Sequence, residues 1–146
     1  MGTVMSENQI VEFLTAGRTN LQLGTVDRKG DAIIQPVWFY YDVPTEKIYV
    51  TTDRGSLKTR NIRRKNSVYF GVDEDGAPYR CVKGKARAKI SETPEQNVDR
   101  VREIAVKYLG SVSDPSAARL LSMAETGQSV VLELVPQYFS TWSFGG

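Results

Sequence analysis

Hydrophobic and polar residues alternate along much of the chain with the period of two that is typical of β-strands. The pattern is clearest between Tyr79 and Ile90. One face of that segment carries small and apolar residues: Val82, Gly84, Ala86, Ala88 and Ile90. The other face is basic: Lys83, Lys85, Arg87 and Lys89. We interpret this basic stripe as the solvated face of a sheet rather than as a second binding site.

The same period predicts further strands over residues 21–27, 47–52, 67–73 and 129–135. The segment AIIQPVWFYYD, residues 32–42, is apolar and aromatic. It predicts a strand that is buried on both faces for part of its length. Because Pro36 has no amide proton to donate, we expect a sheet edge or a bulge there. The last residues, QYFSTWSF at 137–144, are expected to form an aromatic tail.

Helical spacing is confined to a few segments. Ser6 and Gln9 in SENQIVEFL have the spacing of a capping box. In the segment 93–110, Thr93 is expected to cap a helix, Pro94 to start it and Gly110 to end it. DPSAARLLSMAET predicts a second, shorter helix. Many strands and few helices predict a mainly β fold, a small antiparallel barrel with helices packed outside it.

The composition narrows the possible chemistry. The chain has 146 residues, which suits a single domain spanning residues 1–146. It has no histidine, which excludes a Ser-His-Asp or Cys-His catalytic group. With Cys81 as the single cysteine, we expect neither a metal site nor an internal disulfide. The N-terminal residues lack the pattern of a signal peptide or a membrane span, so we expect a cytoplasmic protein.

Positive charge is concentrated in TTDRGSLKTRNIRRK, residues 51–65. The net charge of the chain is only +2. The part from Arg54 to Lys65 holds six basic residues and no acid, so the rest of the chain sums to −4. The six are Arg54, Lys58, Arg60, Arg63, Arg64 and Lys65. Local basicity of this kind favours one discrete anion site over a uniformly positive surface.

Ser56 is expected to be the N-cap of a short helix that follows a strand ending at Thr52 and a turn at Gly55. The first residues of such a helix have free backbone N–H groups that attract phosphate. A cation at Lys58 opposes the helix dipole, and a bound anion would remove that conflict. The alternative interpretation is an ordinary serine cap on a basic surface turn.

At these residues the sequence resembles a known family. IIQPVWFYYD, KIYVTTDRGSLKTRNIRRKNSVYFGVDED and YRCVKGKARAKI are similar to the split-barrel flavin-binding superfamily. That superfamily includes pyridoxamine 5'-phosphate oxidase and its flavin- or deazaflavin-dependent relatives. The resemblance extends over roughly residues 9–143, and its most specific element is SLKTRNIRR at 56–64. This element looks closest to the branch that uses the deazaflavin coenzyme F-420.

The resemblance implies a split antiparallel β-barrel of about six strands that dimerises. It implies two cofactor sites at the subunit interface, for coenzyme F-420 or FMN. The residues expected to bind the cofactor comprise a phosphate clamp, a group near the ribityl chain, and a strand facing the ring largely through its backbone. These are Ser56 and Lys58, then Thr51 and Thr52, then Gln35, Pro36, Val37 and Trp38. Arg60 is a further expected contact, with Arg63 and Arg64 as additional candidates for the acidic tail of coenzyme F-420.

The chain departs from pyridoxamine 5'-phosphate oxidase proper, which holds its substrate with a basic pair that includes histidine. This chain lacks histidine and ends YFSTWSFGG, so oxidation of pyridoxamine phosphate is not expected. Its aromatic tail either lines an apolar pocket at the dimer interface or packs that interface. The tail residues are Tyr138, Phe139, Trp142 and Phe144.

The expected activity is hydride transfer between the cofactor and a small organic substrate, because the ring performs this chemistry without a catalytic side chain. The source of any proton stays open between Tyr40, Tyr41, Lys58 and solvent. A second hypothesis is a cofactor-binding or storage protein without turnover. A third, less favoured, is a small barrel that binds single-stranded nucleic acid; the expected partners are instead a second copy of the chain and a small molecule.

Overall fold

The computed structural model describes residues 2–144, which form four helices and seven strands. The helices are α1 (Glu7–Thr15), α2 (Leu57–Arg64), α3 (Pro94–Leu109) and α4 (Pro115–Thr126). The strands are β1 (Leu21–Val26), β2 (Ala32–Val37), β3 (Phe39–Asp42), β4 (Lys47–Asp53), β5 (Ser67–Asp73), β6 (Cys81–Ser91) and β7 (Ser129–Trp142). The fold is therefore mainly β with flanking helices, as the sequence predicts, with one strand more than expected.

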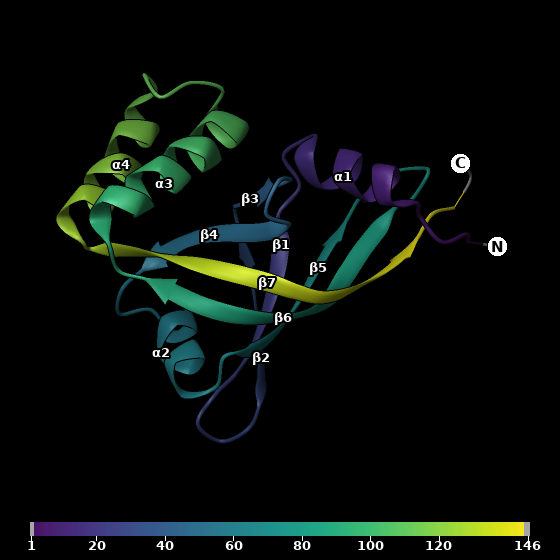
Figure 1. Ribbon diagram of the computed structural model, residues 1–146, viewed down its shortest axis with the longest axis horizontal. Helices are drawn as coiled ribbons and strands as arrows, with labels where there is room; N and C mark the ends of the chain where they lie inside the picture. The colour runs from purple at the N-terminus through teal and green to yellow at the C-terminus, as the bar shows by residue number, and fades with distance from the viewer. Residues whose placement is uncertain (1, 145–146) are drawn as a thin grey trace.

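All seven strands form one antiparallel sheet in the order β2-β1-β5-β6-β7-β4-β3. Its two edge strands, β2 and β3, are consecutive in the chain and are joined by Trp38 alone. A sheet whose edges are joined in this way must curl back on itself, which gives the split barrel (Figure 1). The main core fills its interior, with fully buried side chains that include Leu21, Ile48, Val68 and Leu132.

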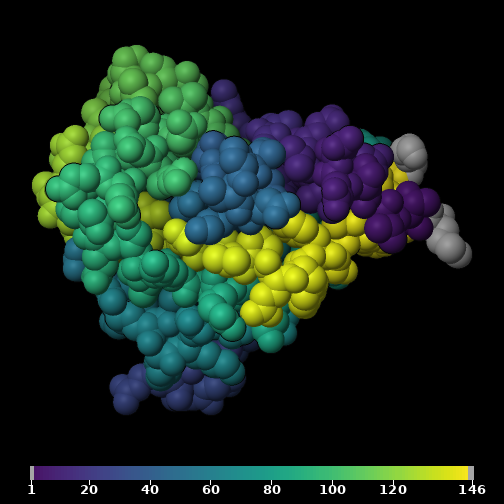
Figure 2. Space-filling view, viewed as in Figure 1, coloured from purple at the N-terminus to yellow at the C-terminus, as the bar shows by residue number. Residues whose placement is uncertain are grey.

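The helices cover different parts of the sheet (Figure 1). Helices α3 and α4 pack together at one end, against β3, β4 and β7. A second, smaller core lies beneath them and includes Tyr49, Val101, Ala124 and Val131. Helix α2 lies on the other side, in contact with β1, β4 and β6. In Figure 2 the blue atoms of the β3–β4 hairpin lie between the purple N-terminal segment and the green α3–α4 pair.

The local helix signals are confirmed with one exception. Ser6 and Gln9 form the expected capping box at the start of α1. Gly110 ends α3 in the left-handed conformation, with φ of 80°. The exception concerns Thr93, which is the N-cap residue of α3 as predicted but makes no capping hydrogen bond with its side chain. Among residues 2–144 no helix is long and apolar enough to cross a membrane.

The segment 32–42 differs from its prediction. It is two short edge strands broken at Trp38 rather than one strand. Its buried side chains alternate, at Val37, Phe39 and Tyr41, so it is not buried on both faces. The edge position accommodates the missing donor of Pro36, as expected from its chemistry.

The C-terminal aromatic segment is part of β7, which continues to Trp142 in register with β6. Phe139 points into the core, where it packs edge-on against Tyr41 and Phe70. Tyr138 and Trp142 are exposed on the opposite face. In the single chain Lys83, Arg87 and Lys89 of β6 are also exposed and Lys85 is half-buried, as expected for the basic face of the sheet.

Candidate functional site

The split of the barrel leaves two strand edges without partners. Pairing between β3 and β4 stops at Phe39 opposite Val50. Had the ladder continued, Trp38 would face Thr51 and Val37 would face Thr52. Instead the chain leaves β4 at Trp38, and residues 32–37 pair with β1. The backbone groups at the end of β4 on this edge, and those on the outer edge of β2, are therefore open to a ligand.

A chain of hydroxyl groups connects the end of β4 to the start of α2. Thr52 Oγ1 donates to Ser56 Oγ at 3.2 Å. Ser56 is the N-cap of α2, as predicted, and its Oγ accepts from the amide of Thr59 at 3.3 Å. Thr59 Oγ1 in turn donates to the carbonyl oxygen of Asp53 at 2.9 Å. Thr51 Oγ1 donates away from this chain, to the carbonyl oxygen of Val130. These bonds fix the turn that presents the N-terminus of α2.

The first turn of α2 has the features of an anion site. Within residues 2–144, no group accepts from the N–H of Leu57 or of Lys58. Lys58 is half-buried and forms no ion pair with any described acid. Two free amides, an unpaired ammonium and the positive end of the helix dipole thus meet at one place. That combination suits a phosphate group.

The arginines around α2 fall into different roles. Glu92 Oε1 accepts from both Arg54 and Arg63, at 2.8 Å in each case. Arg64 donates to the carbonyl oxygen of Val26 at 2.8 Å. Arg60 is exposed and lines a cavity of about 450 Å³ between α2 and the turn that joins β1 to β2. Of these arginines, Arg60 is the one with its guanidinium free of described protein partners and directed to a cavity.

The predicted ring-facing residues of β2 and its end use their side chains in different ways. Val37 is buried in the core and Pro36 is exposed. Trp38 stacks on Tyr108 of α3, with ring centroids 4.7 Å apart and planes 1° from parallel. Gln35 has a buried Oε1 that accepts no hydrogen bond in the described part of the chain. An unsatisfied buried acceptor beside an open strand edge is a place where a donor on a ligand would be stabilised.

Sequence reasoning missed two residues that hold this corner together. Asn61 lies on the buried side of α2, and its Nδ2 donates to Thr25 Oγ1 at 3.0 Å. The sequence carries only a weak indication that Asn61 is buried. It lies among basic residues, and a helix this polar needs at least one side chain that binds it to the sheet. Glu92 clamps Arg54 and Arg63 from far along the chain. No local pattern marks it, because the contact exists only after β6 has packed beside α2.

Comparison with known proteins places the chain in one group of folds. Residues 6–143 match the family described as "Pyridoxamine 5'-phosphate oxidase". No curated protein matches the sequence. A conserved hypothetical protein, Rv2991, from Mycobacterium tuberculosis is similar in structure, with a TM-score of 0.82 at 25% identity. That match covers 96% of this chain and 86% of the other.

Two further solved structures share the fold. One is named F420 reductase, with a TM-score of 0.68 at 23% identity over 88% of this chain and 94% of that one. The other is HutZ, the heme storage protein from Vibrio cholerae, with a TM-score of 0.73 at 19% identity over 95% of this chain and 96% of that one. At these identities the likeness concerns the fold, and it spans proteins with different named roles.

Proposed function

Because the chain belongs to the pyridoxamine 5'-phosphate oxidase family, we propose that it is an oxidoreductase that binds coenzyme F-420 or FMN. The reaction is hydride transfer between this cofactor and a small organic substrate. The observation that carries the proposal is the corner at the start of α2. There the ammonium of Lys58 and two free amides lie next to strand edges that no other strand occupies.

The residues at this corner fit such a cofactor. Ser56 and Lys58, with the amides of the first turn, would hold the phosphate. Thr51 and Thr52, at the end of β4, would lie near the ribityl chain and the ring. The open edges of β2 and β4, with Gln35 Oε1, offer acceptors and donors to a polar ring edge. Glu92, the acid that pairs with the cations around α2, is bound to Arg54 and Arg63 and makes no ion pair with Lys58.

Arg60 extends this cation set toward the neighbouring cavity of about 450 Å³, where the acidic tail of coenzyme F-420 would find a partner. Arg63 is less suited to that role because Glu92 already holds it. Asp27 and Asp31 line the same cavity beside Arg28 and Lys29, so the proposal covers both cofactors. Arg60 should contribute measurably to binding of the deazaflavin, through its acidic tail, and little to binding of FMN.

When bound, the cofactor supplies the hydride chemistry, and the chain supplies binding and orientation. The stack of Trp38 on Tyr108 holds the kink between β2 and β3 and thereby the edge that would orient the ring. Tyr40 and Tyr41 line another cavity, between α1 and α3. We therefore assign any proton delivered at the corner to Lys58 Nζ or to solvent.

We further propose that the protein works as a homodimer with the cofactor sites at its interface. A register row on the outer face of the sheet crosses five strands: Ile34, Gly24, Tyr69, Lys85 and Tyr138. Ile34, Tyr69 and Tyr138 are 69%, 55% and 49% exposed. Large exposed apolar side chains in one row favour burial by a partner. The row begins one residue from Gln35, so a partner that covers it would also approach the open edge of β2.

The direct test is a titration of the purified protein with coenzyme F-420 and with FMN, side by side. Saturable binding of one of them, with reduction of an unsaturated acceptor by its reduced form, is the expected result. Failure to bind both would contradict the proposal.

A second candidate function is a binding protein without turnover. It is favoured by the chemistry of the corner, where Gln35, Thr51, Thr52 and Ser56 do not titrate near neutral pH. A protein named as a heme storage protein shares the fold, which supports this candidate. Tight binding of a cofactor without turnover of any acceptor in a broad panel would favour this candidate over the oxidoreductase.

A further inference from the structure

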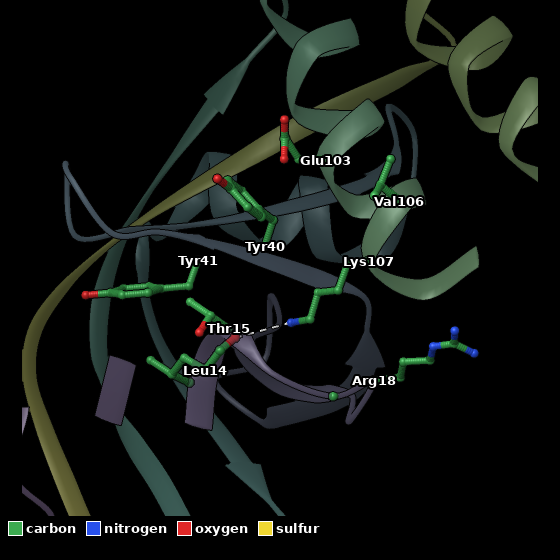
Figure 3. Close-up of a pocket in the computed structure, with 9 residues that line it drawn as sticks. Leu14, Thr15, Arg18, Tyr40, Tyr41, Glu103, Val106 and Lys107 are labelled. Carbon is green, nitrogen blue, oxygen red and sulfur yellow. Dashed lines mark hydrogen bonds between the residues drawn. The ribbon is translucent and has the colours of Figure 1, made fainter. Parts of the chain in front are cut away.

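A second cavity lies where α1, β3 and α3 meet, away from the corner at α2 (Figure 3). Its volume is about 350 Å³, which is within the range of small-molecule sites. The residues that line it include Arg18, Tyr40, Tyr41, Glu103, Val106 and Lys107. None of the residues assigned to the cofactor lines it.

Lys107 is the unusual group in this cavity. Its Nζ donates to the carbonyl oxygen of Leu14 at 3.3 Å, as the dashed line in Figure 3 shows. The same atom lies 3.4 Å from the centroid of the Phe39 ring and 5.2 Å from that of Tyr108. No described carboxylate lies within ion-pair distance of it. Lys107 is thus a desolvated ammonium held by a carbonyl and aromatic faces.

This arrangement has an electrostatic cost that a ligand can relieve. Burial lowers the pKa of Lys107 from 10.5 to about 8, because water no longer stabilises its charge. At neutral pH the group is still mostly protonated. A buried cation with no carboxylate at ion-pair distance gains more from an incoming anion than a solvated lysine does.

The other charges of the cavity define which anion fits. Arg18 lines the cavity and has no ion pair among the described residues. Glu103 lies one turn before Lys107 on α3, beside Tyr40 in Figure 3. Two cations and one carboxylate leave a net charge of +1, which suits a monoanion better than a phosphate dianion.

We propose that this cavity binds a small monocarboxylate with an aromatic or branched apolar body. Lys107 binds the carboxylate, with Arg18 as the second cation. The apolar body packs against Val106 and the ring of Tyr40, which line the cavity and are not part of the closed main core. The site is independent of the cofactor, because it shares no residue with the corner at α2.

The test uses phenylacetate as the probe and the full chain without cofactor, by calorimetry at pH 7. We expect saturable binding, weakened at least about tenfold in Lys107→Met, which keeps the length of the side chain and removes its charge. Lys89→Met is the matched control, since Lys89 is exposed on β6, and its affinity should equal that of the wild type. The neutral amide phenylacetamide should bind at least about tenfold more weakly than phenylacetate.

A second readout separates a binding role from a purely structural one. The ¹⁵N resonance of Lys107 Nζ reports its pKa directly, and saturating phenylacetate should raise that pKa above its value of about 8 in the free protein. Affinity should accordingly fall as pH rises through the free-protein pKa of about 8 and level off above the higher pKa of the bound state. The neighbouring phenols do not interfere, because burial raises the pKa of Tyr40, Tyr41 and Tyr108 above 10.

Three results would overturn the proposal. The first is no binding of phenylacetate to the folded wild type at millimolar concentration. The second is equal affinity in wild type and Lys107→Met. The third is an unchanged Lys107 pKa when phenylacetate is bound. Circular dichroism of Lys107→Met establishes that the variant is folded, and the measurements on the wild type stand without it.

Discussion

The corner at α2 and the cavity at α3 both present a lysine to a ligand, but they are built in opposite ways. The corner takes its hydroxyls and its ammonium from one short segment, the nine residues from Thr51 to Thr59. The cavity takes its groups from α1, β3 and α3, with Leu14 and Lys107 separated by 93 positions. Lys58 is half in solvent, whereas Lys107 is largely desolvated and has a lowered pKa.

The difference teaches how each cation is kept available. At the corner, Arg54 and Arg63 occupy the nearby acid Glu92, so Lys58 stays unpaired although acids are present. In the cavity, burial excludes water and leaves Lys107 with a carbonyl and aromatic faces. The first arrangement depends on competition between solvated charges, and the second on low polarity. Substitutions should therefore have different effects in the two regions.

The largest expected effect is at the corner. Lys58→Ala should weaken binding of coenzyme F-420 or FMN, whichever binds, by about 10- to 100-fold, because a charge-assisted hydrogen bond to phosphate is lost. Arg63→Ala is the matched control from the same helix, and it should change the affinity less than about threefold since Glu92 holds Arg63. Fluorescence titration measures both. Unchanged affinity in Lys58→Ala would contradict the phosphate assignment.

The second largest effect is expected at Tyr108, where α3 packs against β3. The hydroxyl of Tyr108 accepts from the amide of Phe39 at 3.3 Å and donates to the carbonyl of Thr19 at 2.9 Å. Tyr108→Phe leaves the buried amide of Phe39 unsatisfied, whereas the carbonyl of the exposed Thr19 can bond to water, and it should lower the free energy of unfolding by about 2 kcal/mol. Urea denaturation measures it. Tyr79→Phe, at an exposed tyrosine whose hydroxyl makes no hydrogen bond in the described chain, should leave stability unchanged.

The pH dependence of stability should reveal Lys107. Its folded-state pKa of about 8 lies below its unfolded value of 10.5. Between these values the unfolded chain still holds a proton that the folded chain has released, so stability rises with pH. The expected gain is about 1–2 kcal/mol, after reduction of the full shift for the part of the side chain that water screens.

Comparison of wild type with Lys107→Met isolates this contribution, since the tyrosines titrate alike in both proteins. Chemical denaturation at pH 7 and at pH 9.5 should show that wild type gains stability relative to Lys107→Met at the higher pH, by about 1–2 kcal/mol. A difference independent of pH would mean that Lys107 is charged to the same extent folded and unfolded.

The smallest effect is expected for Glu92→Gln. The hydrogen bond from Arg63, and then the charges of Arg63 and Arg54, lower the pKa of Glu92. A lowered carboxyl pKa stabilises the fold above the unfolded value near 4.5, and this contribution is lost as pH falls through the folded value. Because all three side chains are solvated, the thermal midpoint at pH 7 should hardly move. A pronounced drop would show that the clamp carries more than surface ion pairs do.

The parts of the fold that depend on residues close together in the sequence were predictable. Alternation located the buried and basic faces of β6, and the hydroxyl at Ser56 marked the start of α2. Both rest on local geometry, since side-chain direction has a period of two in a strand and capping acts within three residues. The extent of β7 was missed because its aromatic end looks like a tail until β6 provides a register.

Lys107 shows why the second cavity was not predicted. It is three positions after Ile104, and so falls on the apolar side of α3, a signal that the sequence does contain. A lysine there most often extends its ammonium to water. Only the packing of α1 and β3 against α3 places the Leu14 carbonyl and the Phe39 ring around it.

The sequence by itself determined a mainly β chain, the four helix starts and a local cluster of cations at α2, because propensity, capping and charge act between near neighbours. Tertiary structure alone decided which cations stay unpaired, where two strand edges remain open, and how Lys107 is desolvated. Each of these depends on contacts between segments tens of residues apart. Such contacts are set by the closure of the sheet at Trp38 and the docking of α3, which no single segment encodes.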